Sequence, residues 1–117
     1  MRPGPDGDAL YLDMILEIIE RIQGSLDGLD PKSFAEDRDK ADATALRLSA
    51  IGEIGRKLSE ELRARHPEID WVRMFKLRNI VAHHYDRLDF DIIWNVATNA
   101  LNPLEVACRQ ELAEIDK

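Results

Sequence analysis

Apolar residues recur every three or four positions along most of this chain, and that period constrains the fold more than any other feature of the sequence. Residues 9–26 show it most strongly. Their polar positions fall within a sector of about 100° around an ideal helix, and aliphatic side chains cover most of the remainder. A single core-facing stripe needs less apolar surface than this. We therefore expect this helix to bury two sides, one in its own bundle and one against a partner, in a homodimer or higher assembly.

Two further helices are expected in the middle of the chain. One should run from about residue 38 to residue 64, where Gly52 and Gly55 keep the helix surface low and permit close approach by a neighbour. The next should begin at residue 70 or 71 and end near His84. No segment alternates polar and apolar residues as a half-buried strand does.

A last helix is expected after Asp89, which has the short acidic side chain that favours an N-cap. Pro103 lies inside its apolar pattern, and proline both lacks a backbone N–H and clashes with the preceding turn. We therefore expect a kink or break after Asn102. Together these segments predict an all-α bundle of four to five helices with short loops.

Length and cysteine content limit the class of protein. The 117 residues suit one domain spanning 1–117, with residues 1–8 as a flexible leader rich in proline and glycine. Asp8 is the expected N-cap of the first helix. The start has no apolar signal segment and no run could span a bilayer, so a cytoplasmic protein without membrane association is expected. Cys108 is the only cysteine, which excludes a disulfide framework and a cysteine zinc site.

The charge is acidic overall but unevenly distributed. A net charge of −7 argues against coating a long stretch of nucleic acid, which requires many lysines and arginines. Residues 71–88 nevertheless contain four basic residues against one aspartate. A small positive site on an acidic body suits a local contact with phosphate.

The same region contains the residues best suited to chemistry. Arg78, Asn79, His83, His84 and Tyr85 supply a permanent cation, an amide, two imidazoles and a phenol within eight residues. Such groups can hold a phosphodiester, move a proton and accept a nucleotidyl group.

Arg78 and His83 are the first candidates for a catalytic pair. Five residues separate them by about 140° around an ideal helix, so they converge only if the helix ends between them or a second subunit closes the site. A neutral His83 could then accept the proton of a ribose 2′-hydroxyl while Arg78 holds the phosphate oxygens. The alternative is a surface histidine and an arginine that pairs with a carboxylate such as Glu53 or Asp86.

Several short motifs in order resemble the HepT-like branch of the HEPN superfamily. The first expected helix resembles that of the family. Further matching segments are Ile-Gly-Glu-Ile-Gly at 51–55, Pro-Glu-Ile-Asp-Trp at 67–71, Arg-Asn…His-His-Tyr at 78–85, and Asp89 followed by Trp94. The chain departs from the family pattern at Ile54, where alanine is usual, and at Asp70, where proline is usual.

This resemblance implies a HEPN-like fold and a toxin of a type VII-like toxin–antitoxin system. It implies a metal-independent ribonuclease with Arg78 and His83 as the catalytic pair. It also implies that Tyr85 accepts AMP from ATP, transferred by a small MNT-type nucleotidyltransferase that acts as the antitoxin. The implied partners are RNA, this nucleotidyltransferase and a second copy of the chain.

Some residue roles have alternatives. His84 also fits the looser Arg–His spacing, although the His-x-Tyr spacing favours His83. Asn79 could orient Arg78, bond the phosphate or cap the helix internally, and Glu53 could anchor Arg78. Arg47 lies on the apolar line of its helix. It could reach the site, but the preferred interpretation is a side chain that extends to solvent along the edge of that stripe. His66 precedes a proline in a loop, and no spacing suggests metal ligands, so neither a metal nor a cofactor is expected.

A second function remains compatible with the sequence. The chain could be a non-catalytic helical subunit that binds a nucleotidyltransferase and helps it hold its substrate, which the acidic body favours. Retention of Arg78, His83 and Tyr85 together favours the enzyme. A purely structural dimerisation domain is the third reading.

Overall fold

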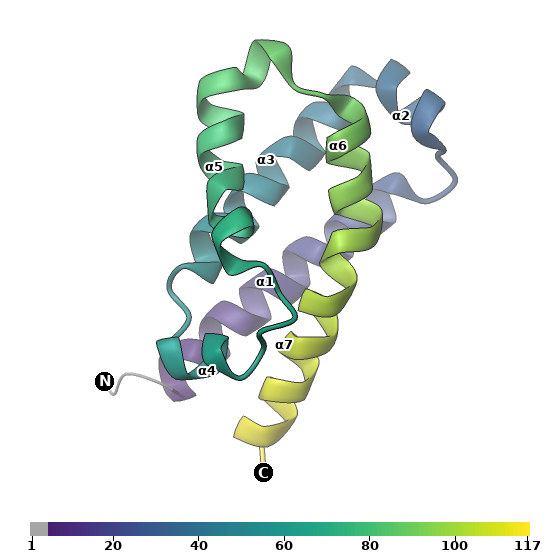
Figure 1. Ribbon diagram of the computed structural model, residues 1–117. Helices are drawn as coiled ribbons and strands as arrows, with labels where there is room; N and C mark the ends of the chain where they lie inside the picture. The colour runs from purple at the N-terminus through teal and green to yellow at the C-terminus, as the bar shows by residue number, and fades with distance from the viewer. Residues whose placement is uncertain (1–4) are drawn as a thin grey trace.

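The protein is all-α, as predicted: the computed structural model describes residues 5–117, and these contain helices and turns but no strand (Figure 1). The α-helices are α1 (Pro5–Leu26), α2 (Pro31–Glu36), α3 (Arg38–Gly55), α4 (Glu60–Ala64), α5 (Trp71–His84), α6 (Phe90–Asn95) and α7 (Leu101–Ile115). A 3₁₀ turn, η1 (Tyr85–Arg87), follows α5, and a π-helical turn, η2 (Val96–Ala100), joins α6 to α7. The expected four or five helices correspond to the longer segments, which the structure divides further.

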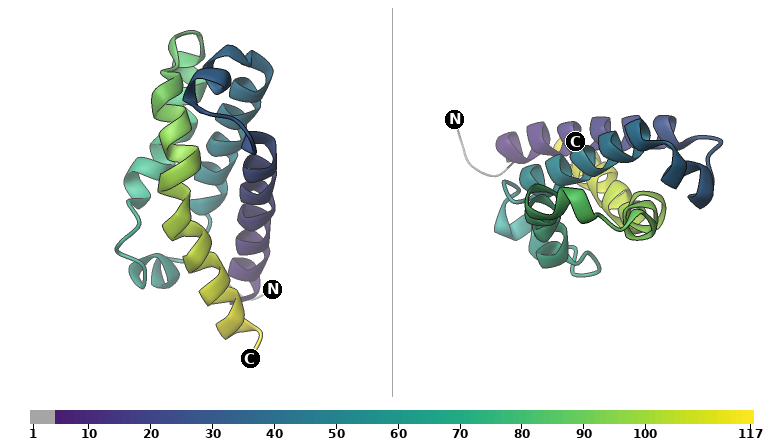
Figure 2. Two further views of the ribbon diagram at one scale, coloured as in Figure 1. Left: turned by 90° about the vertical axis from the view of Figure 1, so that its right-hand side faces the viewer. Right: turned by 90° about the horizontal axis from the view of Figure 1, so that it is seen from above.

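Helix α3 occupies the middle of the bundle. It packs against α1 on one side and α5 on the other, and the view from above shows α1 and α5 in opposite layers (Figure 2). Helix α7 lies along α1, and α2 packs on α6. Because α5 has the bundle on one side only, its other side faces solvent. This is the position in which the expected site residues lie.

The core is aliphatic and continuous. Isoleucines and leucines of α1 and α3 supply its centre, and α2 closes one end through Phe34, whose ring lies 5.3 Å from that of Trp94. Helix α2 begins where local chemistry favours it, because the Asp30 carboxylate accepts a hydrogen bond from the Ser33 amide and Pro31 occupies the first turn. The side chains that are almost fully buried are Leu12, Ile15, Ile19, Ile22, Phe34, Thr44, Leu48, Ile51, Leu62, Leu104 and Cys108.

Helix α1 corrects two expectations about the start of the chain. It begins at Pro5, so residues 5–8 are helical rather than part of a flexible leader, and residues 1–4 lie outside the described part. Asp8 does not cap α1. Its buried carboxylate accepts hydrogen bonds from the amide and the hydroxyl of Ser59, at 2.8 and 2.7 Å. The Asp8 carboxylate therefore binds Ser59, which is distant in sequence, and not the backbone amides of the first turn of α1.

Only one of the two apolar sides expected for α1 is buried within a single chain. One stripe is buried in the core, while Leu10 and Met14 remain 57% and 38% exposed. Burial of this second side against a partner therefore remains a prediction.

The prediction of one long helix over residues 38–64 is wrong for the C-terminal part of that range. Helix α3 ends at Gly55, and α4 starts after Ser59, whose hydroxyl accepts a hydrogen bond from the Leu62 amide. Ser59 acts as an N-cap because its own amide and hydroxyl are held by Asp8. The residues between have good helix propensity, so tertiary contacts decide the break.

The disturbance caused by Pro103 lies earlier than expected. The chain is continuous through Asn102, and the irregular segment is the π-helical turn η2, which ends just before Leu101. A proline has no N–H for the carbonyl four residues back, here that of Asn99, and its ring crowds it. The wider turn upstream accommodates this mismatch, so Pro103 lies in the first turn of α7, where its missing donor costs least.

Helix α5 agrees closely with its expected limits. It starts after Asp70, whose carboxylate accepts a hydrogen bond from the Arg73 amide at 3.0 Å, and it continues to His84. It crosses α3 at Gly52, where an added Cβ would lie 2.6 Å from the carbonyl oxygen of Met74. The sequence predicted that glycine would permit close approach by a neighbouring helix, and Gly52 is the position at which the backbones of α3 and α5 meet.

Candidate active site on helix α5

All five expected site residues lie on exposed surface at the C-terminal end of α5 and in η1. Within one chain they do not converge. Because α5 runs unbroken past His83, the geometry of an ideal helix directs Arg78 and His83 about 140° apart. Asn79 lies between them, about 40° from His83. Of the two conditions under which the pair could converge, a helix end between them is not met, and a second subunit remains.

Arg78 makes the contact that the alternative reading named. Its Nε lies 3.3 Å from a carboxylate oxygen of Glu53 on α3, and both side chains are about half exposed. An ion pair at this exposure contributes little to stability, roughly 0–1 kcal/mol, and exchanges readily with other anions. Glu53 can therefore hold the guanidinium in position without preventing it from binding phosphate.

The two adjacent histidines differ in their surroundings. An Arg87 Nη donates to His84 Nδ1 at 3.3 Å, and because an arginine can only donate, this nitrogen of His84 must accept. While this contact holds, the Nδ1 lone pair of His84 is not available to a substrate. His83 is exposed and has no hydrogen-bond partner among residues 5–117. This difference supports His83 as the base.

Tyr85 has a partner that the sequence did not indicate. Its phenol donates a hydrogen bond of 2.7 Å to a carboxylate oxygen of Asp42 on α3. This bond raises the pKa of Tyr85 above its usual value because it stabilises the protonated phenol, and the nearby negative charge adds to the effect. Asp42 and Glu53 are 11 residues apart, so they lie within about 20° on one edge of α3. That spacing was the available signal: one edge of α3 supplies carboxylates to both ends of the site.

The other arginine and histidine considered from the sequence do not join this site. Arg47 lies about 120° around α3 from Glu53, and its Nη1 is buried with no hydrogen-bond partner among the described residues. His66 is buried, and its Nε2 lies 2.7 Å from Glu111 of α7. Arg65 binds the same carboxylate, and these contacts lower the pKa of Glu111, the arginine being the larger cause. His66 therefore fastens its loop to α7.

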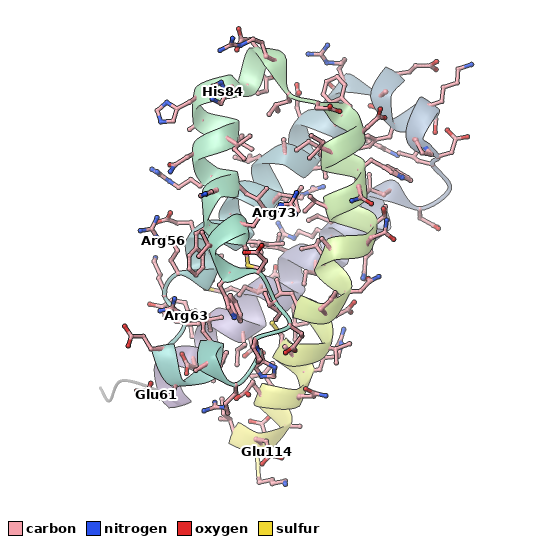
Figure 3. The ribbon with its side chains drawn as sticks, viewed as in Figure 1. Arg56, Glu61, Arg63, Arg73, His84 and Glu114 are labelled. Carbon is pink, nitrogen blue, oxygen red and sulfur yellow. The ribbon has the colours of Figure 1, made fainter. Side chains whose placement is uncertain are left out.

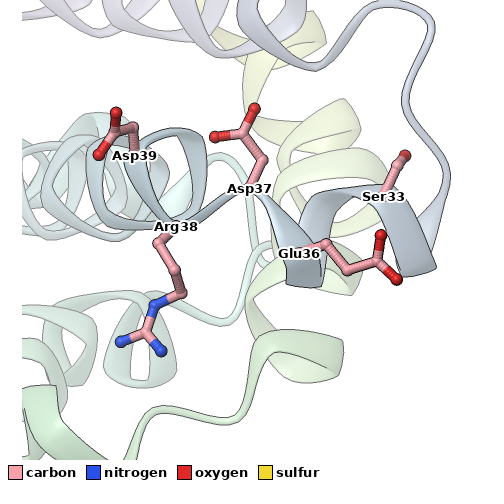
Figure 4. A pocket seen from close by; sticks show the side chains of 5 residues that line it. All are labelled: Ser33, Glu36, Asp37, Arg38 and Asp39. Atoms are coloured by element: carbon pink, nitrogen blue, oxygen red, sulfur yellow. The ribbon is translucent and has the colours of Figure 1, made fainter.

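One hollow of the surface lies away from the α5 residues. A shallow pocket of about 440 Å³ at the junction of α2 and α3 is lined by Ser33, Glu36, Asp37, Arg38 and Asp39 (Figure 4). Three carboxylates make it unsuitable for an RNA phosphate. The Asp37 carboxylate already caps α3, and the Arg38 guanidinium lies 5.1 Å from the centre of the Phe90 ring. The pocket therefore supplies no part of the site.

The part of the chain that the structure describes contains neither a clustered set of metal-binding side chains nor a helix that could span a membrane. In residues 5–117, no group of three or more histidine, cysteine, aspartate or glutamate side chains is arranged to hold a metal ion. Over the same range, every helix is too short or too polar to cross a membrane.

The fold and the exposed residues of α5 define a small all-α domain that presents an arginine, an asparagine and two histidines on the surface of one helix. The model of the HepT-like family, described as "Ribonuclease HepT-like", matches residues 15–111. The chain therefore belongs to the HepT-like ribonuclease family of HEPN proteins, and its enzyme class is that of an RNA endonuclease. The resemblance found in the sequence is confirmed.

Known relatives carry names that agree with this family. A Methanocaldococcus jannaschii protein named "Putative RNase" is 28% identical over 88% of this chain and 84% of its own length. A Thermococcus cleftensis protein named "Probable ribonuclease HepT" is 27% identical over 81% of this chain and 86% of its own. A "Putative RNase" of Caldanaerobacter subterraneus is 26% identical over 87% and 91%, respectively. No solved structure matches the chain.

Proposed function

We propose that this protein is the toxin of a toxin–antitoxin pair and cuts RNA without a metal ion. His83 removes the proton from a ribose 2′-hydroxyl, and the resulting oxygen attacks the adjacent phosphorus. Arg78 stabilises the charge that develops on the phosphate oxygens. The bond from phosphorus to the 5′-oxygen breaks, that oxygen takes up a proton, and a 2′,3′-cyclic phosphate remains on the other fragment.

One observation supports a site shared by two copies of the chain. Arg78 and His83 point about 140° apart on an unbroken helix, so the site is incomplete within one chain. The His83 side of α5 also bears exposed apolar residues, with Val72 62% and Ile80 43% exposed. Apolar surface of this kind favours association. In the proposed homodimer, Arg78 of one copy approaches His83 of the other across two facing α5 helices.

Tyr85 is the proposed site of control. A nucleotidyltransferase antitoxin would join the Tyr85 oxygen to the α-phosphorus of ATP and release pyrophosphate, while the phenolic proton passes to a carboxylate or to solvent. Tyr85 is half exposed and only two residues beyond His83, so an attached AMP would add bulk and negative charge where RNA must bind. Tyr85→Phe keeps the ring and removes the nucleophile. Intact mass after incubation with the partner and ATP-Mg²⁺ should then rise for the wild type only.

Two observations favour a second function. Arg78 is paired with Glu53, and the chain has a net charge of −7, so a free RNA would be repelled at long range. A non-catalytic subunit that binds a nucleotidyltransferase would tolerate both features. Growth arrest when the chain is expressed without a partner separates the two, because only the toxin causes it. We favour the toxin, acting in the cytoplasm, since the chain belongs to a ribonuclease family and retains Arg78 and His83.

The direct test uses purified protein and a labelled RNA in excess EDTA. Cleavage should persist, and the upstream fragments should end in 2′,3′-cyclic phosphate. The His83→Ala protein prepared in parallel should leave the RNA intact, which excludes a contaminating nuclease. Activity that disappears in EDTA and returns with Mg²⁺ would refute the mechanism even if the protein cuts RNA.

A further inference from the structure

Two arginines from different elements lie over one aromatic ring near the N-terminal end of α5. The ring belongs to Phe75. The guanidinium carbon of Arg56, from the turn after α3, lies 5.9 Å from the ring centre, and that of Arg63, from α4, lies 5.4 Å from it. The Trp71 ring is 6.3 Å from the same ring. Figure 3 shows Arg56 and Arg63 on the same side of the molecule, beside α5.

This arrangement places two like charges around one ring, and the ring compensates neither of them fully. An aromatic ring attracts a guanidinium but does not neutralise it. Among the side chains that the structure describes, residues 7–117, the ion pairs within 4.0 Å include neither Arg56 nor Arg63, although Glu60 and Glu61 are near in sequence. Among the described side chains, the hydrogen bond of these two guanidiniums is from Arg63 Nε to the Leu58 carbonyl. Their remaining N–H groups can each donate to an anion, and bound anions would offset the two charges.

The cluster lies next to the candidate active site. On an ideal helix, Phe75 falls between the two catalytic positions, about 60° from Arg78 and about 80° from His83. Along the helix axis, His83 lies about 12 Å beyond Phe75. Successive phosphates of a nucleic-acid strand are about 3.4 Å apart along a helix axis, so a bound strand would cover this distance within a few nucleotides.

We propose that Arg56, Arg63 and Phe75 form a binding site for single-stranded RNA on the approach to the cleavage site. Each guanidinium binds a backbone phosphate, and the exposed part of the half-buried Phe75 ring, with Trp71 beside it, packs against a base or ribose. This inference rests on the proposed ribonuclease function. An acidic protein partner would use the charges but not the ring, and its surface would not need to continue towards His83, so RNA is the ligand that fits the whole cluster.

The test measures binding separately from cleavage. The probe is a fluorescent single-stranded oligoribonucleotide with 2′-O-methyl groups, which cannot be cut because the attacking hydroxyl is blocked. Its affinity is measured by anisotropy over a range of salt concentrations. The variant is Arg56→Gln/Arg63→Gln. The control is Arg21→Gln/Arg109→Gln, which removes the same charge from two exposed, ion-paired arginines on α1 and α7.

The cluster variant should bind about tenfold or more weakly than the wild type, and the dependence of log affinity on log salt should be shallower by about 1.4 for two lost phosphate contacts. The control should stay close to the wild type. Equal weakening in both variants, or none in either, overturns the proposal, and the latter result would assign the cluster to a protein partner. If wild-type protein binds the probe through this cluster but never cuts unmodified RNA, the inference stands and the proposed function fails.

Discussion

His83 and His84 are adjacent in the chain but differ in which ring nitrogens are free, and this difference makes a sharp prediction. His83→Ala should abolish RNA cleavage, because it removes the one imidazole of the site without a hydrogen-bond partner among the described residues. His84→Ala should keep much of the activity, since its Nδ1 is occupied by Arg87. Initial cleavage rates of the two proteins on one RNA are the measurement. An inactive His84→Ala protein beside an active His83→Ala protein would reverse the assignment of the base.

Tyr85 should titrate at an unusually high pH because its phenol donates to Asp42. The chain has two tyrosines, so Tyr85 can be followed alone by phenolate absorbance in a Tyr11→Phe background. Asp42→Asn should lower the Tyr85 pKa towards the ordinary value, because the amide has no negative charge to oppose ionisation. Asp39→Asn, which removes a charge from the same helix, is the control.

The same bond has a consequence for stability. The folded-state pKa of Tyr85 is raised, so the stabilisation from this bond is fully present below the ordinary pKa of tyrosine, about 10, and is lost as the pH rises through the folded value. Wild type should therefore lose more stability than Asp42→Asn in this alkaline range. Identical titration curves for the two proteins would mean that the Asp42 contact does not form in solution.

The exposed site residues could be named from sequence because they lie within eight consecutive positions. Their partners could not. Asp42 and Glu53 precede Tyr85 and Arg78 by many residues, and only the packing of α3 on α5 brings each pair together. Two carboxylates spaced 11 residues apart indicate one helix edge, but nothing local indicates which helix faces that edge.

Helix α3 depends on Gly52 at its crossing with α5. Gly52→Ala should destabilise the protein by about 1–3 kcal/mol, since the new methyl group would lie 2.6 Å from the Met74 carbonyl oxygen and force the two helices apart. Gly24→Ala, in an open position of α1, should instead stabilise by about 0.5–1 kcal/mol through helix propensity. Urea unfolding of both variants measures the difference. A Gly52→Ala protein as stable as the wild type would show that the helices cross less closely.

Helix α7 is held to the loop after α4 by Glu111, and this contact should make stability depend on pH. The pKa of Glu111 is lowered by its hydrogen bonds to Arg65 and then His66. The resulting stabilisation is present above the ordinary carboxyl pKa of about 4.5 and is lost as the pH falls through the lower folded value.

Glu111→Gln should therefore reduce stability near neutral pH by about 1–3 kcal/mol and flatten its decline in acid. Glu17→Gln, which removes an exposed carboxylate paired with Arg21, should change neither by much. Urea unfolding at pH 7 and in mild acid compares the three proteins. The contact would have no energetic role if Glu111→Gln followed the wild-type profile.

Helix limits set by local chemistry were predictable, whereas those set by distant contacts were not. Asp70 and Asp89 cap their helices with their own carboxylates, as the sequence indicated. The role of Asp8 and the break after α3 were missed together, because Asp8 accepts hydrogen bonds across the fold from Ser59, the N-cap of α4. The sequence predicted an irregularity in the helix near Pro103, but not its position: the π-helical turn lies upstream of the proline, at Val96–Ala100.

The all-α class followed from a helical period that no segment of the chain contradicts, and an aliphatic core confirms it. The assembly is a separate question. Leu10 and Met14 on α1, and Val72 and Ile80 on α5, remain exposed in the single chain. These four side chains lie on helices in opposite layers, so one two-fold contact need not cover both sets (Figure 2). The proposed site requires only that the α5 sides meet.

Subunit complementation tests the shared site most directly. Arg78→Ala and His83→Ala should each be inactive as separate proteins. After mixing and subunit exchange, half of the dimers are mixed. Each mixed dimer contains one intact site, with Arg78 from one copy and His83 from the other, so about a quarter of wild-type activity should return. A mixture that exchanges subunits but stays inactive would contradict a site built from two copies of α5.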